Sequence, residues 1–177
     1  MIHQKQYQWL ANENSPKVIT EAVKLYGTKE IVGKQHSKEI LSWAKELGLE
    51  KTYTNDEIPW CGLFTAIIVK RAGFDVVKSP LWAKDWLNFG TEQKTAMLGD
   101  ILVFTRPGGG GHVGMYVGED DTCYHVLGGN QSNMVNTTRI LKSRCVGIRR
   151  CKWKVSQPTN VRVIKLASTG SVSTNEA

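Results

Sequence analysis

Cys61 is the residue whose type and surroundings are best suited to nucleophilic chemistry. It follows Pro59-Trp60 directly and begins an apolar stretch, 61–72, whose composition predicts a buried helix. The first turn of a helix carries about half a positive charge and has free N–H groups. These groups stabilise a thiolate and also the oxyanion that forms when a carbonyl is attacked. An inert cysteine in the core is the competing interpretation, because cysteine is common in protein interiors.

His112 is the candidate base for that thiol. It follows a glycine-rich loop, 105–111, and begins a β-rich segment that runs to Val117. Strand alternation turns the apolar side chains at 113, 115 and 117 toward the core and leaves His112 on the opposite face. A histidine at the start of a strand is often incidental, but Gly114 on the same face leaves room for a reactant.

Asn130 is the third polar residue of the expected site. The strand that precedes it is expected to pair with the strand of His112 through a tight turn at 119–122. With a five-residue connection, Gly118 faces Tyr124. His112 then faces Asn130 on the same side of the sheet. A connection of four residues would shift the pairing by one and break this match.

A thiol at a helix N-terminus, an imidazole and a side-chain carbonyl form the arrangement of acyl-transfer enzymes. His112 is expected to take the proton of Cys61 and later to give one to the leaving amine, while Asn130 fixes the imidazole tautomer. Cys123 and Cys145 lie in apolar, strand-like surroundings and are expected to be core side chains. No disulfide is expected, and the cysteine spacing matches no zinc pattern.

Four segments resemble the motifs of NlpC-like and CHAP peptidoglycan hydrolases. Pro-Trp-Cys-Gly at 59–62 is similar to their cysteine motif, and 99–104 to their Gly-Asp-aliphatic strand. Residues 111–118 resemble their histidine strand, and 128–132 the motif of their third polar residue. The resemblance covers 55–150. It implies a papain-like α+β fold, with N-terminal helices packed on a small antiparallel sheet, and cleavage of amide bonds in or beside the stem peptide.

The chain also departs from that family pattern. Many CHAP proteins have a glutamate two residues before the asparagine, where this chain has Gly128. Asn130 is then the orienting group that we expect, with Gln131 as the alternative. Some relatives bind calcium near the cysteine, but three adjacent polar residues at 55–57 do not make the spaced pattern of a calcium loop. We therefore expect neither a metal nor another cofactor.

Aromatic residues near the cysteine are expected to contact the substrate. Trp60 and Trp82 have flat faces that suit sugar rings and short peptides, and Tyr53 is placed upstream to help polarise the scissile carbonyl. The spacing of Trp82, Trp86 and Phe89 is also that of a helix. A stripe of core side chains is therefore the favoured interpretation of these three residues, with a substrate groove as the other.

The elements that position these residues follow from the periodicity of the sequence. An α+β domain is expected, with helices in the first half and an antiparallel sheet in the second. We expect an N-terminal helical part at 1–48, a catalytic core at 49–166 that forms one compact domain with it, and a flexible tail at 167–177. The expected helices are 16–26, 37–47 and 61–72, followed by a short helix or turn at 82–89. The expected strands are 99–104, 112–117, 123–127 and 146–150.

Net charge and the N-terminal sequence suggest where the protein acts. The chain of 177 residues carries a formal charge of +7, which favours acidic polymers such as the bacterial envelope. No signal sequence or membrane-spanning run is evident. A monomer that acts on bacterial peptidoglycan, without nucleic acid or membrane insertion, is expected. A phage endolysin that stays in the host cytoplasm until it is released to the wall fits these features, as do a secreted toxin and a tail-associated enzyme.

Two further functions remain open at this point. One is a papain-like enzyme that transfers or hydrolyses a different acyl substrate. The other is a non-catalytic wall-binding or nucleic-acid-binding module that kept the fold. The combination of Cys61, His112 and Asn130 favours a peptidoglycan amidase or endopeptidase that acts through a cysteine thioester.

Overall fold

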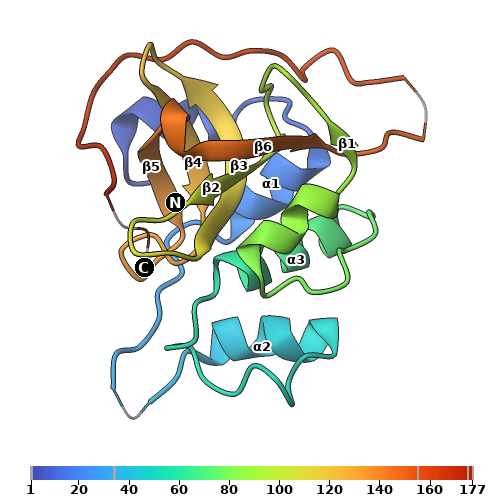
Figure 1. The fold of residues 1–177 in the computed structure, drawn as a ribbon, viewed down its shortest axis with the longest axis vertical. Coiled ribbons are helices and arrows are strands. Elements are labelled where there is room, and N and C mark those ends of the chain that lie inside the picture. The colour runs from blue at the N-terminus through green and yellow to red at the C-terminus, as the bar shows by residue number, and fades with distance from the viewer. Residues whose placement is uncertain (1, 34, 155, 175, 177) are drawn as a thin grey trace.

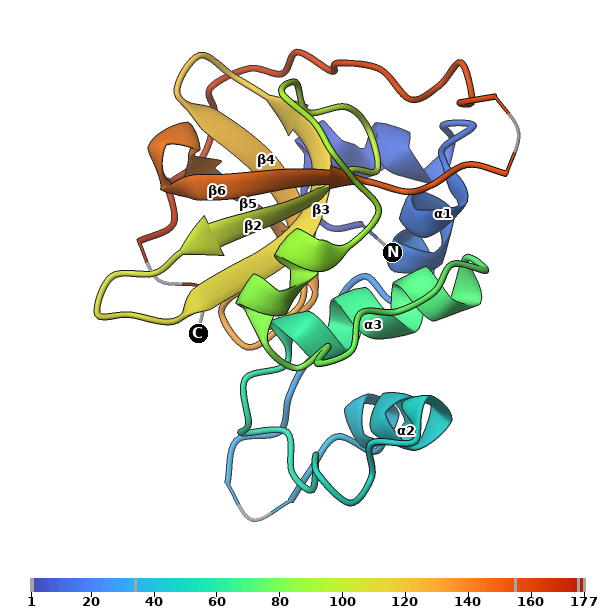
Figure 2. The same cartoon turned by 45° about the vertical axis from the view of Figure 1, so that its right-hand side comes forward.

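The chain forms an α+β domain in which helices cover one face of an antiparallel sheet (Figure 1). The computed structural model describes residues 2–33, 35–154, 156–174 and 176. Helix α3 lies directly against the sheet, and α2 lies on the far side of α3 (Figure 2). Mixed helix and sheet were expected, and this part of the fold prediction is confirmed.

The helices fall mainly in the first half of the chain. Helix α3 is apolar on all sides because it is packed between α2 and the sheet, and its residues 61–69 are all buried. Helix α2 begins at the N-cap Ser37 and ends at Gly48, whose φ of 73° is a left-handed conformation that suits glycine. The helical segments are η1 (Lys5–Ala11), α1 (Lys17–Lys24), α2 (Lys38–Leu47), α3 (Cys61–Arg71), η2 (Ala83–Asn88) and η3 (Lys142–Arg144).

The described residues form a sheet of six strands, and every pair of neighbours is antiparallel. The strand order is β1-β6-β2-β3-β4-β5, so that β3 lies in the interior of the sheet. The strands are β1 (Thr91–Glu92), β2 (Ile101–Thr105), β3 (Gly111–Glu119), β4 (Cys123–Gly128), β5 (Asn136–Leu141) and β6 (Cys145–Arg150).

Each face of the sheet has its own apolar cluster. The larger cluster lies between the sheet and the helices, where Val113, Met115 and Val117 of β3 face α3 as the alternation predicted. A smaller cluster on the other face contains Phe104 and Tyr116 and is covered in part by Ile164. The chain after β6 therefore crosses back over the sheet (Figure 2).

The register between β3 and β4 differs from the prediction at the turn. Glu119 pairs with Tyr124, which makes the connection one residue shorter than expected. A β-bulge between Tyr116 and Gly118 then absorbs the shift, so that Met115 pairs with Leu127. The predicted pairing of Gly118 with Tyr124 is wrong, but the bulge restores the predicted register toward the His112 end of the strand.

The expected helices and strands are all present, with ends that differ by a few residues. Strand β5 was missed because its sequence, Asn-Thr-Thr-Arg-Ile-Leu, is polar at its start and does not form an apolar run. The segment expected as 82–89 is a 3-10 helix, η2. The boundaries at 48 and 166 and the flexibility of 167–177 stay predictions, and positions 175 and 177 of that tail lie outside the described residues.

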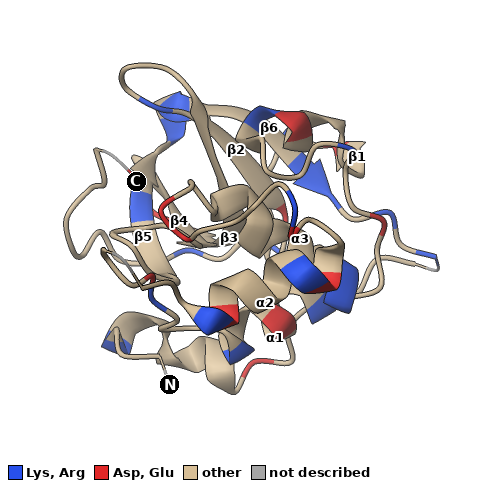
Figure 3. Cartoon of the chain, turned by 90° about the horizontal axis from the view of Figure 1, so that it is seen from below, with Lys and Arg blue, Asp and Glu red and all other residues tan. Residues whose placement is uncertain are grey.

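Charged side chains are spread over many elements. Figure 3 shows lysine and arginine on separate helices, strands and loops, with aspartate and glutamate among them, and not in one continuous basic stripe. None of the described helices combines the length and the apolar character that crossing a bilayer requires.

Candidate active site

Cys61 is the first residue of α3, as predicted, and its side chain is almost completely buried, with 5% exposed. Burial raises the pKa of the thiol above its ordinary value. The backbone N–H groups of Val113 and Gly62 hydrogen-bond the sulfur and act in the opposite direction. Because Val113 follows His112 directly, the contact places the thiol against the backbone of the predicted base.

The start of α3 is enclosed by the segment that leads into η2. A Cβ added at Gly62 would lie 2.2 Å from the carbonyl oxygen of Pro80, so only glycine allows the two backbones to come this close. The same segment contacts Gly111, where an added Cβ would lie 3.3 Å from the side chains of Ala83 and Lys84. Residues 80–84 therefore border both the thiol and the start of β3.

His112 is 1% exposed and lies at the start of β3, where it faces the ring of Phe104. Its Nε2 lies 3.0 Å from Oε1 of Gln131. The amide nitrogen of Gln131 donates to the carbonyl oxygens of Val126 and Asn136, at 3.2 Å and 2.7 Å, which fixes the amide with its oxygen toward the imidazole. Nε2 of His112 therefore donates, and Nδ1 is left as the basic nitrogen.

Gln131, and not Asn130, makes the hydrogen bond to His112 in the described structure. Strand β4 ends at Gly128, and Asn130 has a φ of 57°, in the left-handed region. This turn breaks the strand alternation on which the choice of Asn130 depended. The neighbouring glutamine was the alternative from the sequence, and no local pattern distinguishes the two amides before the turn is known.

Two adjacent glycines bring the end of β4 between His112 and α3. A Cβ at Gly128 would lie 2.7 Å from Oε1 of Gln131 and 3.2 Å from Nε2 of His112. A Cβ at Gly129 would lie 2.7 Å from the ring of Trp60. Any side chain at Gly128 would displace the Gln131 amide, so the hydrogen bond from His112 to Gln131 depends on glycine at this position.

Burial also sets the protonation state of the histidine. It lowers the pKa of His112 to about 4, whereas the charge of Glu176 and the hydrogen bond that His112 donates to Gln131 oppose this shift. Arg106 and Arg144 lower the pKa further. With the thiol pKa raised and the imidazole pKa lowered, the resting pair is a neutral thiol and a neutral imidazole. The arrangement therefore suits general-base removal of the thiol proton during attack.

The three aromatic residues assigned to the substrate lie in different environments. Trp60 and Tyr53 are buried in the core, where the Trp60 indole N–H donates to Glu30 and the Tyr53 hydroxyl donates to the carbonyl oxygen of Ile58. Trp82 is 75% exposed and belongs to the segment that borders Gly62. Of the three, only the Trp82 ring is open to a ligand in this conformation.

Asp56, one of the polar residues at 55–57, has a structural role. Its buried carboxylate accepts hydrogen bonds from the backbone N–H groups of Ile31 and Ser37 and contacts Nδ1 of His36. It therefore holds the loop before α2. Among the described residues, no group of three or more His, Cys, Asp or Glu side chains is placed to hold a metal ion.

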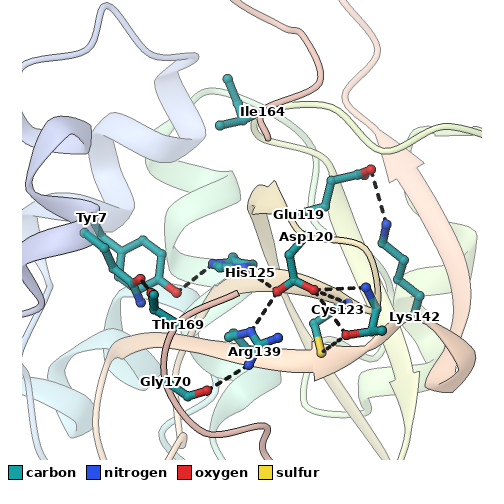
Figure 4. Close-up of polar contacts among 12 residues, drawn as sticks. Tyr7, Glu119, Asp120, Cys123, His125, Arg139, Lys142, Ile164, Thr169 and Gly170 are labelled. Carbon is teal, nitrogen blue, oxygen red and sulfur yellow. Dashed lines mark hydrogen bonds and ion pairs between the residues drawn. The ribbon is translucent and has the colours of Figure 1, made fainter. Parts of the chain in front are cut away.

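A second histidine lies in a buried polar network on β4 and β5 (Figure 4). His125 Nδ1 contacts the hydroxyl of Tyr7 at 2.7 Å, and its Nε2 contacts Asp120 at 2.9 Å. Arg139 Nε donates to the same carboxylate oxygen of Asp120 at 2.7 Å. Since His125 is fully buried and its two nitrogens are both bonded, the network ties η1 to the sheet and offers no open base.

Comparisons with models of protein families, with curated proteins and with solved structures found no match. The case for a function therefore depends on the geometry of Cys61, His112 and Gln131 and on the motifs in the sequence.

Proposed function

We propose that the protein is a cysteine hydrolase with a papain-like core that cleaves amide bonds in or beside the stem peptide of bacterial peptidoglycan. The observation that carries the proposal is the contact of the Cys61 sulfur with the N–H of Val113, beside a His112 whose Nε2 is held by Gln131. These residues would serve as a nucleophile, a base and a group that orients the base.

The reaction follows from the roles of these groups. Nδ1 of His112 accepts the thiol proton as the sulfur of Cys61 attacks the amide carbon, and N–H groups at the start of α3 stabilise the negative oxygen. The C–N bond breaks as the imidazolium gives its proton to the leaving amine, which leaves a thioester on Cys61. A water molecule, deprotonated by His112, then hydrolyses the thioester and releases the thiol.

The substrate class comes from the resemblance to NlpC-like and CHAP enzymes, and two features of the chain support it. The exposed ring of Trp82, which follows the Pro80-Leu81 backbone against Gly62, suits a sugar ring or a short peptide. The formal charge of +7 favours approach to the anionic wall. We further propose that a monomer acts in phage-induced lysis of the host, where it is released to the wall from the cytoplasm.

The test is the clearing of purified sacculi by wild type, Cys61→Ala and Cys145→Ala, followed by mass spectrometry of the released fragments. We expect clearing by wild type and by Cys145→Ala, which removes a different free thiol, and none by Cys61→Ala. The fragments identify the amide that is cut. Equal clearing by Cys61→Ala would exclude the cysteine mechanism, and no clearing across several wall types would exclude peptidoglycan as the substrate.

A further inference from the structure

Residues 172, 173 and 176 contact β5 and η3. Val172 forms a parallel bridge with Arg139 of β5, and the N–H of Ser173 donates to the carbonyl oxygen of Arg139 at 2.8 Å. Nη1 of Arg139 donates to the carbonyl oxygen of Gly170 (Figure 4). Several backbone contacts therefore fix the direction of the chain before it reaches Glu176.

The Glu176 side chain makes a two-point contact with Arg144. Nη1 and Nη2 of Arg144 donate to the two carboxylate oxygens at 2.8 Å and 2.6 Å. Glu176 is only 1% exposed, so the pair is largely removed from water. Paired donors on a planar guanidinium are the usual recognition of a carboxylate in proteins.

The remaining contacts of Arg144 place this carboxylate beside His112. Its Nε donates to the carbonyl oxygen of Thr105 at 3.0 Å, and the Thr105 hydroxyl donates to the carbonyl oxygen of Arg144 at 3.3 Å. Thr105 pairs with Gly111, the residue directly before His112. Consistent with this placement, the charge of Glu176 raises the pKa of His112. The contacts with Thr105 of β2 therefore hold the Arg144 guanidinium in place independently of its carboxylate partner.

We propose that Arg144 forms a carboxylate-binding subsite beside His112, which Glu176 fills in cis, so that Glu176 competes with a substrate that carries a carboxylate near the scissile amide. The inference deepens the proposed function, on which it depends for Cys61 as the reacting thiol. Both Cys61 and His112 are buried in the described structure, and the charge of Glu176 acts on His112. A peptide with a free carboxylate displaces Glu176 and takes its place on Arg144.

Alkylation of Cys61 tests the subsite without any turnover. The thiolate displaces iodide from iodoacetamide, which is neutral, or from iodoacetate, which carries a carboxylate, and forms a thioether that mass spectrometry of the Cys61 peptide quantifies. The rates are compared in wild type, Glu176→Gln and Glu92→Gln. Glu92 is a matched control because its carboxylate is exposed on β1 and contacts Arg149 at 3.9 Å.

We expect Glu176→Gln to react faster with both reagents, and the gain for iodoacetate to exceed that for iodoacetamide by about tenfold, as one charge-assisted contact allows. The double variant Glu176→Gln with Arg144→Gln keeps the gain for iodoacetamide and loses the extra gain for iodoacetate. Glu92→Gln reacts like wild type. Circular dichroism and thermal melting show that each variant is folded.

Three results would overturn the inference. If the alkylation rates of Glu176→Gln lie within twofold of those of wild type, Glu176 does not restrict access to the Cys61 thiol. Equal gains for both reagents mean that Arg144 does not select a carboxylate. If the extra gain for iodoacetate persists in the double variant, a cation other than Arg144 selects the carboxylate. Failure to clear sacculi, with the expected alkylation pattern intact, would count against the proposed substrate and leave the subsite standing.

Discussion

At the scale of single residues, the orientation of His112 depends on which amide holds it. Gln131 is fixed by the carbonyl oxygens of Val126 and Asn136, so its oxygen is presented to Nε2 of the imidazole. Asn130 occupies the turn just before it, with a positive φ. The two neighbours therefore have different roles, one as the positioning residue of the base and the other as the residue that permits the turn.

Replacing Gln131 by Ala should lower kcat by at least about tenfold, because general-base catalysis is worth about 10²- to 10⁴-fold and needs the correct tautomer. KM should change little. Steady-state kinetics on soluble wall fragments measure both. The control is Asn130→Gly, which removes the other amide and still accepts the left-handed backbone. A larger loss in that control than in Gln131→Ala would return the orienting role to Asn130, and recovery in Gln131→Glu would support a hydrogen-bonding role.

The buried His112 also makes the stability of the protein depend on pH. Burial lowers its pKa to about 4, below the ordinary value of 6.5. Between these values the unfolded chain binds a proton that the folded chain does not, so the free energy of unfolding falls as the pH falls from about 6.5 to about 4. The contribution is about 1.4 kcal/mol per pH unit in that window.

Urea unfolding at pH 7, 6 and 5 measures this slope in wild type and in His112→Gln. We expect a smaller loss of stability per pH unit in the variant, because glutamine has no proton to gain. Equal slopes in the two proteins would mean that His112 titrates normally in the folded state.

At the scale of elements, the sequence predicted those features that depend on local periodicity. The start of α3 at Cys61 and the inward face of β3 follow from apolar patterns, and both are present. The bulge next to Tyr116 and the left-handed turn at Asn130 arise from tertiary packing and leave no periodic signal. The places of Cys61 and His112 in the fold were therefore predicted, while the residue that holds the His112 ring required the actual path of the backbone.

Strands β4 and β5 are joined to η1 by the buried contacts of Asp120. Burial by itself would raise the pKa of this carboxyl, but Arg139, the N–H of Thr122 and His125 together hold it well below its ordinary value. Asp120→Asn leaves Arg139 without its buried counter-charge. The variant should lower the free energy of unfolding by about 3 kcal/mol, as loss of one partner of a buried ion pair does.

Chemical denaturation compares Asp120→Asn with Asp121→Asn, a neighbouring change at an exposed position. We expect a stability close to that of wild type in the second variant. Wild-type stability in Asp120→Asn as well would mean that the network contributes little to the folded state.

At the scale of the whole molecule, the site draws on segments that are far apart in the chain. Helix α3 supplies the thiol, β3 the imidazole, the turn after β4 the orienting amide, and η3 and Glu176 the paired charges beside them. The helices and the sheet meet at this point, which is also the end of the sheet toward which the chain returns (Figure 1).

The strand order has a consequence for how the protein folds. In the strand order β1-β6-β2-β3-β4-β5, β6 lies between β1 and β2. The edge of β2 that faces away from β3 therefore has no partner until β6 has formed. Contacts between such distant segments form slowly compared with hairpins and helices. A chain still being synthesised therefore carries β2 with an open edge, and the sheet beneath the helix of Cys61 is completed only after β6 has been made.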